Sequence, residues 1–253
     1  MRDGELATPA NHGEQPHESS RLEKPKRRRG RGLIVLVVVA FVTYLTRDTL
    51  LHAVASGLVV RDTSRKADFA LILGGDRCYE EASRQYHAGT VRGILLIEFI
   101  PSRLVRIGVL PSDEELARRE LSKHGVPETA IEIVRGQATS MWDAARHTEE
   151  WLNEHSGARL LILCPRFSAR ERRWIFSRVL GTGEAGDLTW HGLRDRRYDE
   201  TTWWHRKEGV LDVFNSYVSL GYVWLNGEQP STWHEWDAEE WLAVSFDGNR
   251  KRE

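Results

Sequence analysis

A glycine pair followed by two charged residues is the first place in this sequence where chemistry is expected. Gly74 and Gly75 end a predicted strand at 68–73, which is apolar from Phe69 onward, and Asp76 and Arg77 follow at once. Adjacent glycines let the backbone turn tightly and approach a ligand closely, and a helix that begins after them can bind an anion at its N-terminus. Asp76 is a candidate general base or cation ligand, although capping the helix is the most frequent role for such a residue.

A second group of candidates is basic. Four arginines follow another apolar run, at 159–164, and such a cluster suits a phosphate or a carboxylate. Because the arginines lie on a predicted helix, part of the cluster must face solvent, and solvation explains that part. The four are Arg166, Arg170, Arg172 and Arg173. Polar residues after the other apolar runs are further candidates: Glu98, Ser102, Thr139, Ser140, Asp143, Cys164 and Ser168.

Alternating strands and helices must position these residues. Apolar runs of strand length are predicted at 68–73, 93–97, 130–134, 159–164 and 188–190. Amphipathic runs of helix length are predicted at 79–88, 112–124, 140–155, 169–180 and 208–224. Continuous apolar strands separated by helices indicate a mostly parallel sheet with both faces covered, so we expect a three-layer α/β/α, Rossmann-like domain. All strand carboxyl ends then meet at one edge of the sheet, where such folds bind ligands.

The same segments carry a resemblance to a known family. They are GLVVRDTSRKADFALILGGD, YHAG, GILL, EELARRELSKHGVPETAIEIV, ATSMWDAARHTEEWL and LLILCPRFSARERRWIF. In order and spacing they resemble the YdcF-like family of envelope proteins, to which SanA and ElyC belong. The resemblance covers about residues 58–180, and WWHRKEGVLDVFNSYVSLGYVWL is similar to the closing helix of the family. Members are linked to envelope integrity and peptidoglycan-related processes.

The resemblance implies a ligand site in the loops at the strand ends. The matching residues are Gly74, Gly75, Asp76, Glu115, Ser140, Asp143 and Arg170. Spacing alone instead makes Glu115 a surface residue at the capping-box position behind the expected N-cap Ser112. Two loops depart from the family pattern: EFIP at 98–101 replaces the usual Ser-Gly, and Ser168 stands near the place of a histidine. Loss of an imidazole removes the best general acid and base, so we expect binding without turnover.

The N-terminal region predicts a membrane anchor. Six basic residues within 24–31 precede an uncharged apolar run of 14 residues, 33–46. That run spans only about 21 Å as a helix, which suits a signal peptide better than a bilayer core of about 30 Å. However, no small-residue cleavage site follows directly, and the span can extend to Leu51, so we expect an uncleaved transmembrane anchor at 33–51. The positive-inside rule places the N-terminus in the cytoplasm and the domain outside the plasma (inner) membrane.

Composition limits the remaining possibilities. The segment 1–32 carries 8 Lys and Arg against 5 Asp and Glu, whereas the rest of the chain carries 28 against 32. The domain therefore has no strong basic field, which disfavours nucleic-acid binding. Two cysteines, Cys78 and Cys164, form no disulfide framework and no metal site, although an oxidising compartment would allow them to pair. The sequence assigns no cofactor.

Seven of the ten tryptophans lie between 190 and 241. We expect Trp203, Trp204 and Trp224 to pack the last helix on the sheet. The others near the C-terminus lie in a polar segment, where they would stack on sugar rings, lie at a membrane interface or, most simply, dock onto the domain.

The expected organisation has four parts: a disordered cytoplasmic tail (1–32), an anchor (33–51), a YdcF-like α/β domain (58–225) and a Trp-rich polar tail (226–253). The first functional hypothesis is an envelope protein that binds a small anionic or lipid-linked glycan ligand. In that hypothesis the ligand site is lined by Gly74, Gly75, Arg77, Glu115, Ser140, Asp143, Arg166, Ser168 and Arg170. The second is a hydrolase or transferase on such a ligand, with Asp76 as base and the region of Arg166 and Arg170 as an anion clamp. The third, a redox-linked scaffold with paired cysteines, is the weakest.

Overall fold

The computed structural model describes residues 28–62, 66–181 and 188–227. The chain divides into two compact units, Met1–Arg47 and Asp48–Glu253, and each is described by itself. The expectations for the tail at 1–32 and for the Trp-rich segment at 226–253 fall almost entirely outside the described residues.

Helix α1 (Arg28–Ser56) contains the expected apolar segment. Its portion Ile34–Ser56 has a mean hydropathy of 1.9, and none of the most apolar stretch is buried. These 23 residues measure about 35 Å at 1.5 Å per residue, which is enough to cross a bilayer core. Among the described residues, α1 is the one helix long and apolar enough to span a membrane. It continues past Leu51, where we expected the anchor to end, and stops before Gly57.

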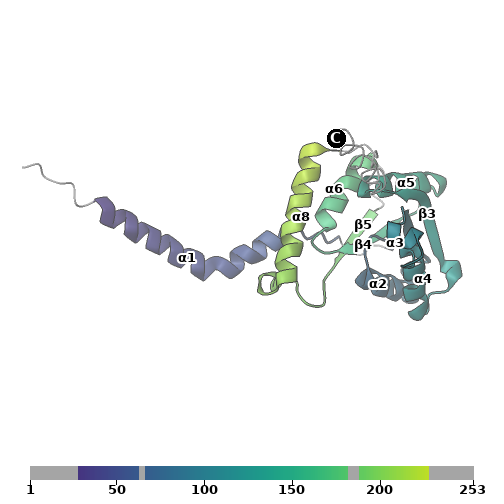
Figure 1. Ribbon diagram of the computed structural model, residues 1–253, viewed down its shortest axis with the longest axis horizontal. Helices are drawn as coiled ribbons and strands as arrows, with labels where there is room; N and C mark the ends of the chain where they lie inside the picture. Colours follow the sequence, from purple (N-terminus) through teal and green to yellow (C-terminus); the bar gives the residue numbers. More distant parts are fainter. Residues whose placement is uncertain (1–27, 63–65, 182–187, 228–253) are drawn as a thin grey trace, which may run out of the picture. The chain divides into compact units, whose positions relative to one another are not determined.

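Within the described residues, five strands form one parallel sheet in the order β3-β2-β1-β4-β5. Figure 1 shows the domain, with β3, β4 and β5 labelled among its helices. The strands are β1 (Phe69–Ile72), β2 (Gly93–Phe99), β3 (Ile131–Ala138), β4 (Leu160–Pro165) and β5 (Leu188–Leu193). In the central strands, Leu71 is 0% exposed and Leu161 is 6% exposed. Both faces of the sheet are therefore buried, as the continuous apolar runs predict.

Helices cover both faces of the sheet. α2 (Asp76–His87) and α4 (Asp113–Lys123) pack on one face, and α5 (Met141–Glu154) and α6 (Ala169–Val179) pack on the other. The apolar cluster on the first face includes Ala82 and Leu121, and the cluster on the second includes Trp151 and Phe176. The expected three-layer α/β/α, Rossmann-like fold is confirmed.

The last described helix, α8 (Lys207–Asn226), packs beside α6 and follows a short 3-10 turn, η3 (Trp203–His205). A third apolar cluster joins α8 to the end of α1 and to the loops after β4 and β5. Its buried members are Ala55, Leu58, Phe167, Tyr198, Trp203 and Val213. The start of the domain is therefore fastened to its last helix.

Several details differ from the sequence expectations. α2 begins at Asp76, three residues early, because its first turn is charged and carries no apolar signal. β3 extends to Ala138, and two short elements, α3 (Arg103–Arg106) and η1 (Glu128–Ala130), were not expected. Trp203 is buried as predicted, but the expectation for Trp224 is wrong because its side chain is 68% exposed.

Candidate functional site

The order of the strands places a topological switch point between β1 and β4, because the chain winds toward β2 and β3 on one side and toward β5 on the other. Cavities in parallel folds of this kind occur at that point, outside the carboxyl ends of the strands. Two cavities lie there, on either side of the turn Gly74–Gly75. We call them the β1–β4 cavity and the β1–β2 cavity.

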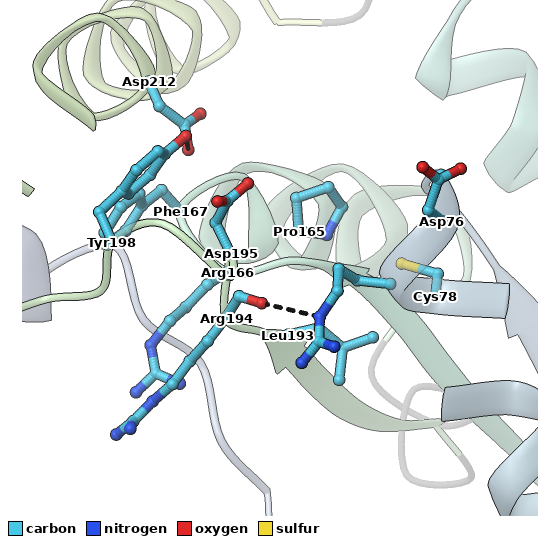
Figure 2. Close-up of a pocket in the computed structure, with 12 residues that line it drawn as sticks. Asp76, Cys78, Pro165, Arg166, Phe167, Leu193, Arg194, Asp195, Tyr198 and Asp212 are labelled. Atoms are coloured by element: carbon cyan, nitrogen blue, oxygen red, sulfur yellow. Dashed lines mark hydrogen bonds between the residues drawn. The ribbon is translucent and has the colours of Figure 1, made fainter. Parts of the chain in front are cut away.

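The β1–β4 cavity has a volume of about 250 Å³. Figure 2 shows its walls, which come from the start of α2, the loops after β4 and β5, and α8. It is lined by Gly75, Asp76, Arg77, Cys78, Pro165, Arg166, Phe167, Leu193, Arg194, Asp195, Tyr198 and Asp212.

The two glycines of the turn have different surroundings: Gly74 is tightly packed, whereas Gly75 faces open space. A Cβ on Gly74 would lie 2.7 Å from Cys78 Sγ and 2.9 Å from Pro165 Cδ, whereas a Cβ on Gly75 would meet nothing within 4 Å. Gly74 therefore brings α2 against β4, and Gly75, the N-cap of α2, leaves the helix N-terminus open to the β1–β4 cavity.

Three carboxylates border the β1–β4 cavity: Asp76, Asp195 and Asp212. The Tyr198 hydroxyl donates a hydrogen bond of 3.2 Å to Asp212 Oδ2. Burial raises the pKa of Asp212 and raises the pKa of Tyr198 to about 12. Hydrogen bonds from Arg197 lower the pKa of Asp195. The cavity thus holds one carboxyl group suited to carrying a proton and another suited to staying ionised.

A buried charge cluster supports the β1–β4 cavity from below. Arg166 Nη2 donates to Glu200 Oε1 at 2.6 Å, and Arg194 and Arg61 reach the same oxygen at 3.2 and 3.4 Å. The Arg166 side chain is 6% exposed, and both its Nε and Glu200 Oε2 are buried without a hydrogen-bond partner. In Figure 2 the Arg166 and Arg194 side chains run side by side away from Asp212. Three cations around one carboxylate leave a net positive charge beside the cavity.

Arg77 forms the floor of the β1–β4 cavity. Its Nε donates to the Arg194 carbonyl oxygen at 3.3 Å, and its Nη1 donates to Glu80 Oε2 at 2.7 Å. The first contact, drawn in Figure 2, joins the start of α2 to the loop after β5.

The β1–β2 cavity is larger, about 340 Å³, and fewer of its lining residues are charged. Its floor includes Ile72, Leu96 and Ile97, and Arg172 crosses its edge to donate a hydrogen bond to the Leu73 carbonyl oxygen. Its carboxylates, Asp113 and Glu114, lie at the start of α4, where acidic residues are favourable for the helix itself.

The structure brings only some of the sequence candidates together. Gly75, Asp76, Arg77 and Arg166 line the β1–β4 cavity, and Gly74 lines its neighbour. Ser140, Asp143, Glu115, Ser168 and Arg170 line neither cavity.

Ser140 and Asp143 form a capping box at the start of α5. The Asp143 amide donates to Ser140 Oγ at 3.2 Å, and the Ser140 amide donates to Asp143 Oδ2 at 3.1 Å. Burial by itself would raise the pKa of Asp143, but hydrogen bonds from Thr139 and Arg146 lower it to about 2. Capping accounts for both residues.

The other three candidates lie on helix starts. Glu115 is exposed; its amide donates to Ser112 Oγ at 3.0 Å, which confirms the expected cap, and its carboxylate pairs with Arg119 at 2.9 Å. Ser168 Oγ donates to the Pro165 carbonyl oxygen at 3.1 Å. Arg170 is exposed on the first turn of α6.

Sequence reasoning missed Arg194, Asp195, Tyr198, Glu200 and Asp212. Asp195 was accessible to the strand-end rule, but β5 was expected to end at Trp190 and it ends at Leu193. The available signal for Asp212 was that it is the one charged residue beyond the first turn of the apolar last helix.

Both cysteines are free and buried, and burial raises the pKa of Cys78 to about 12 and of Cys164 to about 11. In the described part of the chain, no group of three or more His, Cys, Asp or Glu side chains is placed to hold a metal ion. No protein-family model matches the sequence, and no curated protein matches it.

Proposed function

We propose that this chain is a single-pass protein of the plasma (inner) membrane whose extracytoplasmic domain binds a small anionic or lipid-linked glycan ligand in the β1–β4 cavity. The observation that carries the proposal is that cavity itself: it lies at the switch point of a parallel sheet and gathers three carboxylates, three arginines and a tyrosine. The resemblance to YdcF-like envelope proteins supports a role in cell-envelope or peptidoglycan-related processes.

The N-terminal region supports the membrane part of the proposal. Ile34–Ser56 has the length and hydropathy of a span, and a basic block precedes it. By the positive-inside rule this arrangement keeps the N-terminus in the cytoplasm and exports the domain.

The cavity lining favours a polyhydroxylated ligand. Sugar hydroxyls donate hydrogen bonds to carboxylates such as Asp76 and Asp195, accept them from guanidinium groups, and leave a less polar ring face for Tyr198. An anionic group on the same ligand would meet the N-terminus of α2 and the positive charge around Glu200. A glycan attached to a lipid phosphate has both features.

One observation favours the alternative, a hydrolase or transferase on such a ligand. Asp212 holds its proton more tightly than an ordinary aspartate and contacts the Tyr198 hydroxyl, so it suits a general acid. Asp76, exposed at the opposite wall, then takes the role of base. This pair would replace the imidazole whose place Ser168 occupies.

The test is the lipid that stays with the full-length protein when it is purified from its native membrane in a mild detergent. We expect mass spectrometry to find a glycolipid on the wild type and a several-fold loss in Asp195→Asn and Tyr198→Phe. Asp113→Asn, in the β1–β2 cavity, is the matched control and should retain the lipid. The reverse pattern would move the site to the other cavity and refute the proposal. A product that accumulates with the wild type but not with Asp212→Asn would establish the enzymatic alternative.

A further inference from the structure

One side of α8 exposes apolar side chains along its whole length. Leu211, Phe214, Val218 and Leu225 follow one another at helical spacing and are 48, 63, 55 and 74% exposed, and Trp224 beside them is 68% exposed. We call these five residues the α8 stripe. A soluble surface helix normally presents polar side chains on this side.

The opposite side of α8 is already packed. Val213, Ser216 and Val223 are buried against the domain, and Gly209 lies so close to Trp203 that a Cβ would sit 2.5 Å from its carbonyl oxygen. From Leu211 to Asn226 the only charged residue is Asp212, which faces the β1–β4 cavity. The α8 stripe is therefore a second apolar surface of α8, distinct from the side that packs against the domain.

The α8 stripe adjoins the end of the membrane span. Tyr217 Oη donates a hydrogen bond of 2.5 Å to the Val54 carbonyl oxygen, and Trp203 Nε1 donates to the Leu51 carbonyl oxygen at 3.2 Å. A Cβ on Gly57 would lie 2.6 Å from Tyr217 Oη, so the chain leaving the span passes directly against α8. Val54 and Leu51 belong both to the candidate span Ile34–Ser56 and to the unit that contains α8.

We propose that the α8 stripe lies in the headgroup layer of the same bilayer that α1 spans, with its side chains among the upper acyl chains. The occupant of the stripe is therefore lipid. The continuity with the span argues for it, because Tyr217, midway along α8, is hydrogen-bonded to a residue in the last turn of the span. The composition agrees, because Tyr217 and Trp224 are of the two residue types enriched at that surface. α8 has 20 residues but lacks the hydropathy of a second span, as expected of an interfacial helix.

This placement explains how a lipid-linked ligand reaches the domain. Asp212 lies between stripe residues Leu211 and Phe214 along α8 and lines the β1–β4 cavity, so a docked α8 holds the cavity at the level of the lipid headgroups. The inference rests on the anchoring part of the proposed function, and it does not depend on which ligand binds.

The experiment measures the depth of single labelled cysteines in the full chain. The native cysteines are buried with raised pKa values, so an exposed cysteine reacts selectively with an environment-sensitive fluorophore. The positions are Val218→Cys in the stripe, Val38→Cys in α1, Ile107→Cys in an exposed apolar loop after α3, and Arg119→Cys on α4. The protein is reconstituted in phosphatidylcholine vesicles with or without phosphatidylcholine that carries a nitroxide quencher near the headgroup end of its acyl chain.

We expect the label at 218 to be quenched several-fold more than the labels at 107 and 119, and Phe214→Glu in the same protein to reduce that quenching. If the label at 38 is quenched and the label at 218 is not, the anchor holds and the docking of α8 is refuted. An apolar but unquenched label at 218, in vesicles and in detergent alike, would mean that the C-terminal segment or a second copy covers the stripe, which also overturns the inference. Lack of quenching at 38 would instead refute the anchoring.

Discussion

The two cavities beside the glycine turn differ in how their charged groups are used. In the β1–β2 cavity the carboxylates belong to the first turn of α4, and Arg172 donates a hydrogen bond to the Leu73 carbonyl oxygen. In the β1–β4 cavity Asp212 sits on an apolar helix where it serves no cap, and Arg166 keeps a buried Nε without a partner. Polar residues at a strand end therefore indicate a ligand site only when they are not already needed to cap a helix or to hydrogen-bond a backbone group.

The largest expected effect concerns the charge cluster beneath the β1–β4 cavity. Glu200→Gln leaves Arg166 buried without its carboxylate, which should cost about 3–5 kcal/mol in the free energy of unfolding. Urea unfolding of the full chain in detergent micelles measures it. Glu115→Gln, which breaks an exposed ion pair, is the matched control and should change stability by less than about 1 kcal/mol. Equal losses of unfolding free energy in the two variants would show that the ion pair of Arg166 with Glu200 contributes no more to stability than an exposed one.

The glycine turn that separates the cavities comes next. Gly74→Ala forces a methyl group against Cys78 and the rigid Pro165 ring, and overpacking of this kind costs about 1–3 kcal/mol. Gly75→Ala places its methyl group in open space and should leave the unfolding midpoint nearly unchanged. If both variants unfold at the same denaturant concentration, α2 does not pack against β4 as closely as Gly74 would allow.

A smaller effect tests the residues that the structure assigns to capping. Ser140→Ala should cost about 1 kcal/mol through the loss of the N-cap. The pKa of Asp143 is lowered to about 2, so its stabilisation is present above the pKa of an unfolded aspartate, about 4, and is lost as the pH falls through about 2. The unfolding temperatures of Asp143→Asn and the wild type should therefore differ at neutral pH and converge in acid. Loss of bound lipid from a stably folded Ser140→Ala would instead return this residue to the ligand site.

The smallest expected effect is a gain in stability, in the variant Asp212→Asn. The pKa of Asp212 is raised by burial, so its favourable contribution is present in acid and is lost as the pH rises through the raised value. Asp212→Asn should consequently be slightly more stable than the wild type at neutral pH, and the advantage should vanish in acid. Thermal unfolding at a series of pH values measures this difference. A wild type that is more stable than the variant at neutral pH would show that the ionised Asp212 is held by favourable contacts.

The fold was predictable because its signals are local and continuous. Short runs such as Phe69–Ile72 and Leu160–Pro165 are apolar at every position, as expected of strands buried on both faces. The glycine turn followed from the same strand. The rest of the site was less accessible, since Tyr198 and Glu200 contact the loop after β4 and the chain after α1, more than thirty positions away. No spacing rule connects such residues.

The chain that follows the candidate span Ile34–Ser56 also pairs with one edge of the sheet. Arg61 forms an antiparallel bridge with His191, the Asp62 amide donates to the Trp190 carbonyl oxygen at 3.2 Å, and the Trp190 amide donates to Asp62 Oδ2 at 3.0 Å. An open edge strand is a template for pairing with another chain, and proteins confined to a membrane surface meet their neighbours often. Here Arg61 and Asp62 occupy this part of the outer edge of β5. Another copy of the chain can therefore pair with β5 at this point only after these two residues have detached from it.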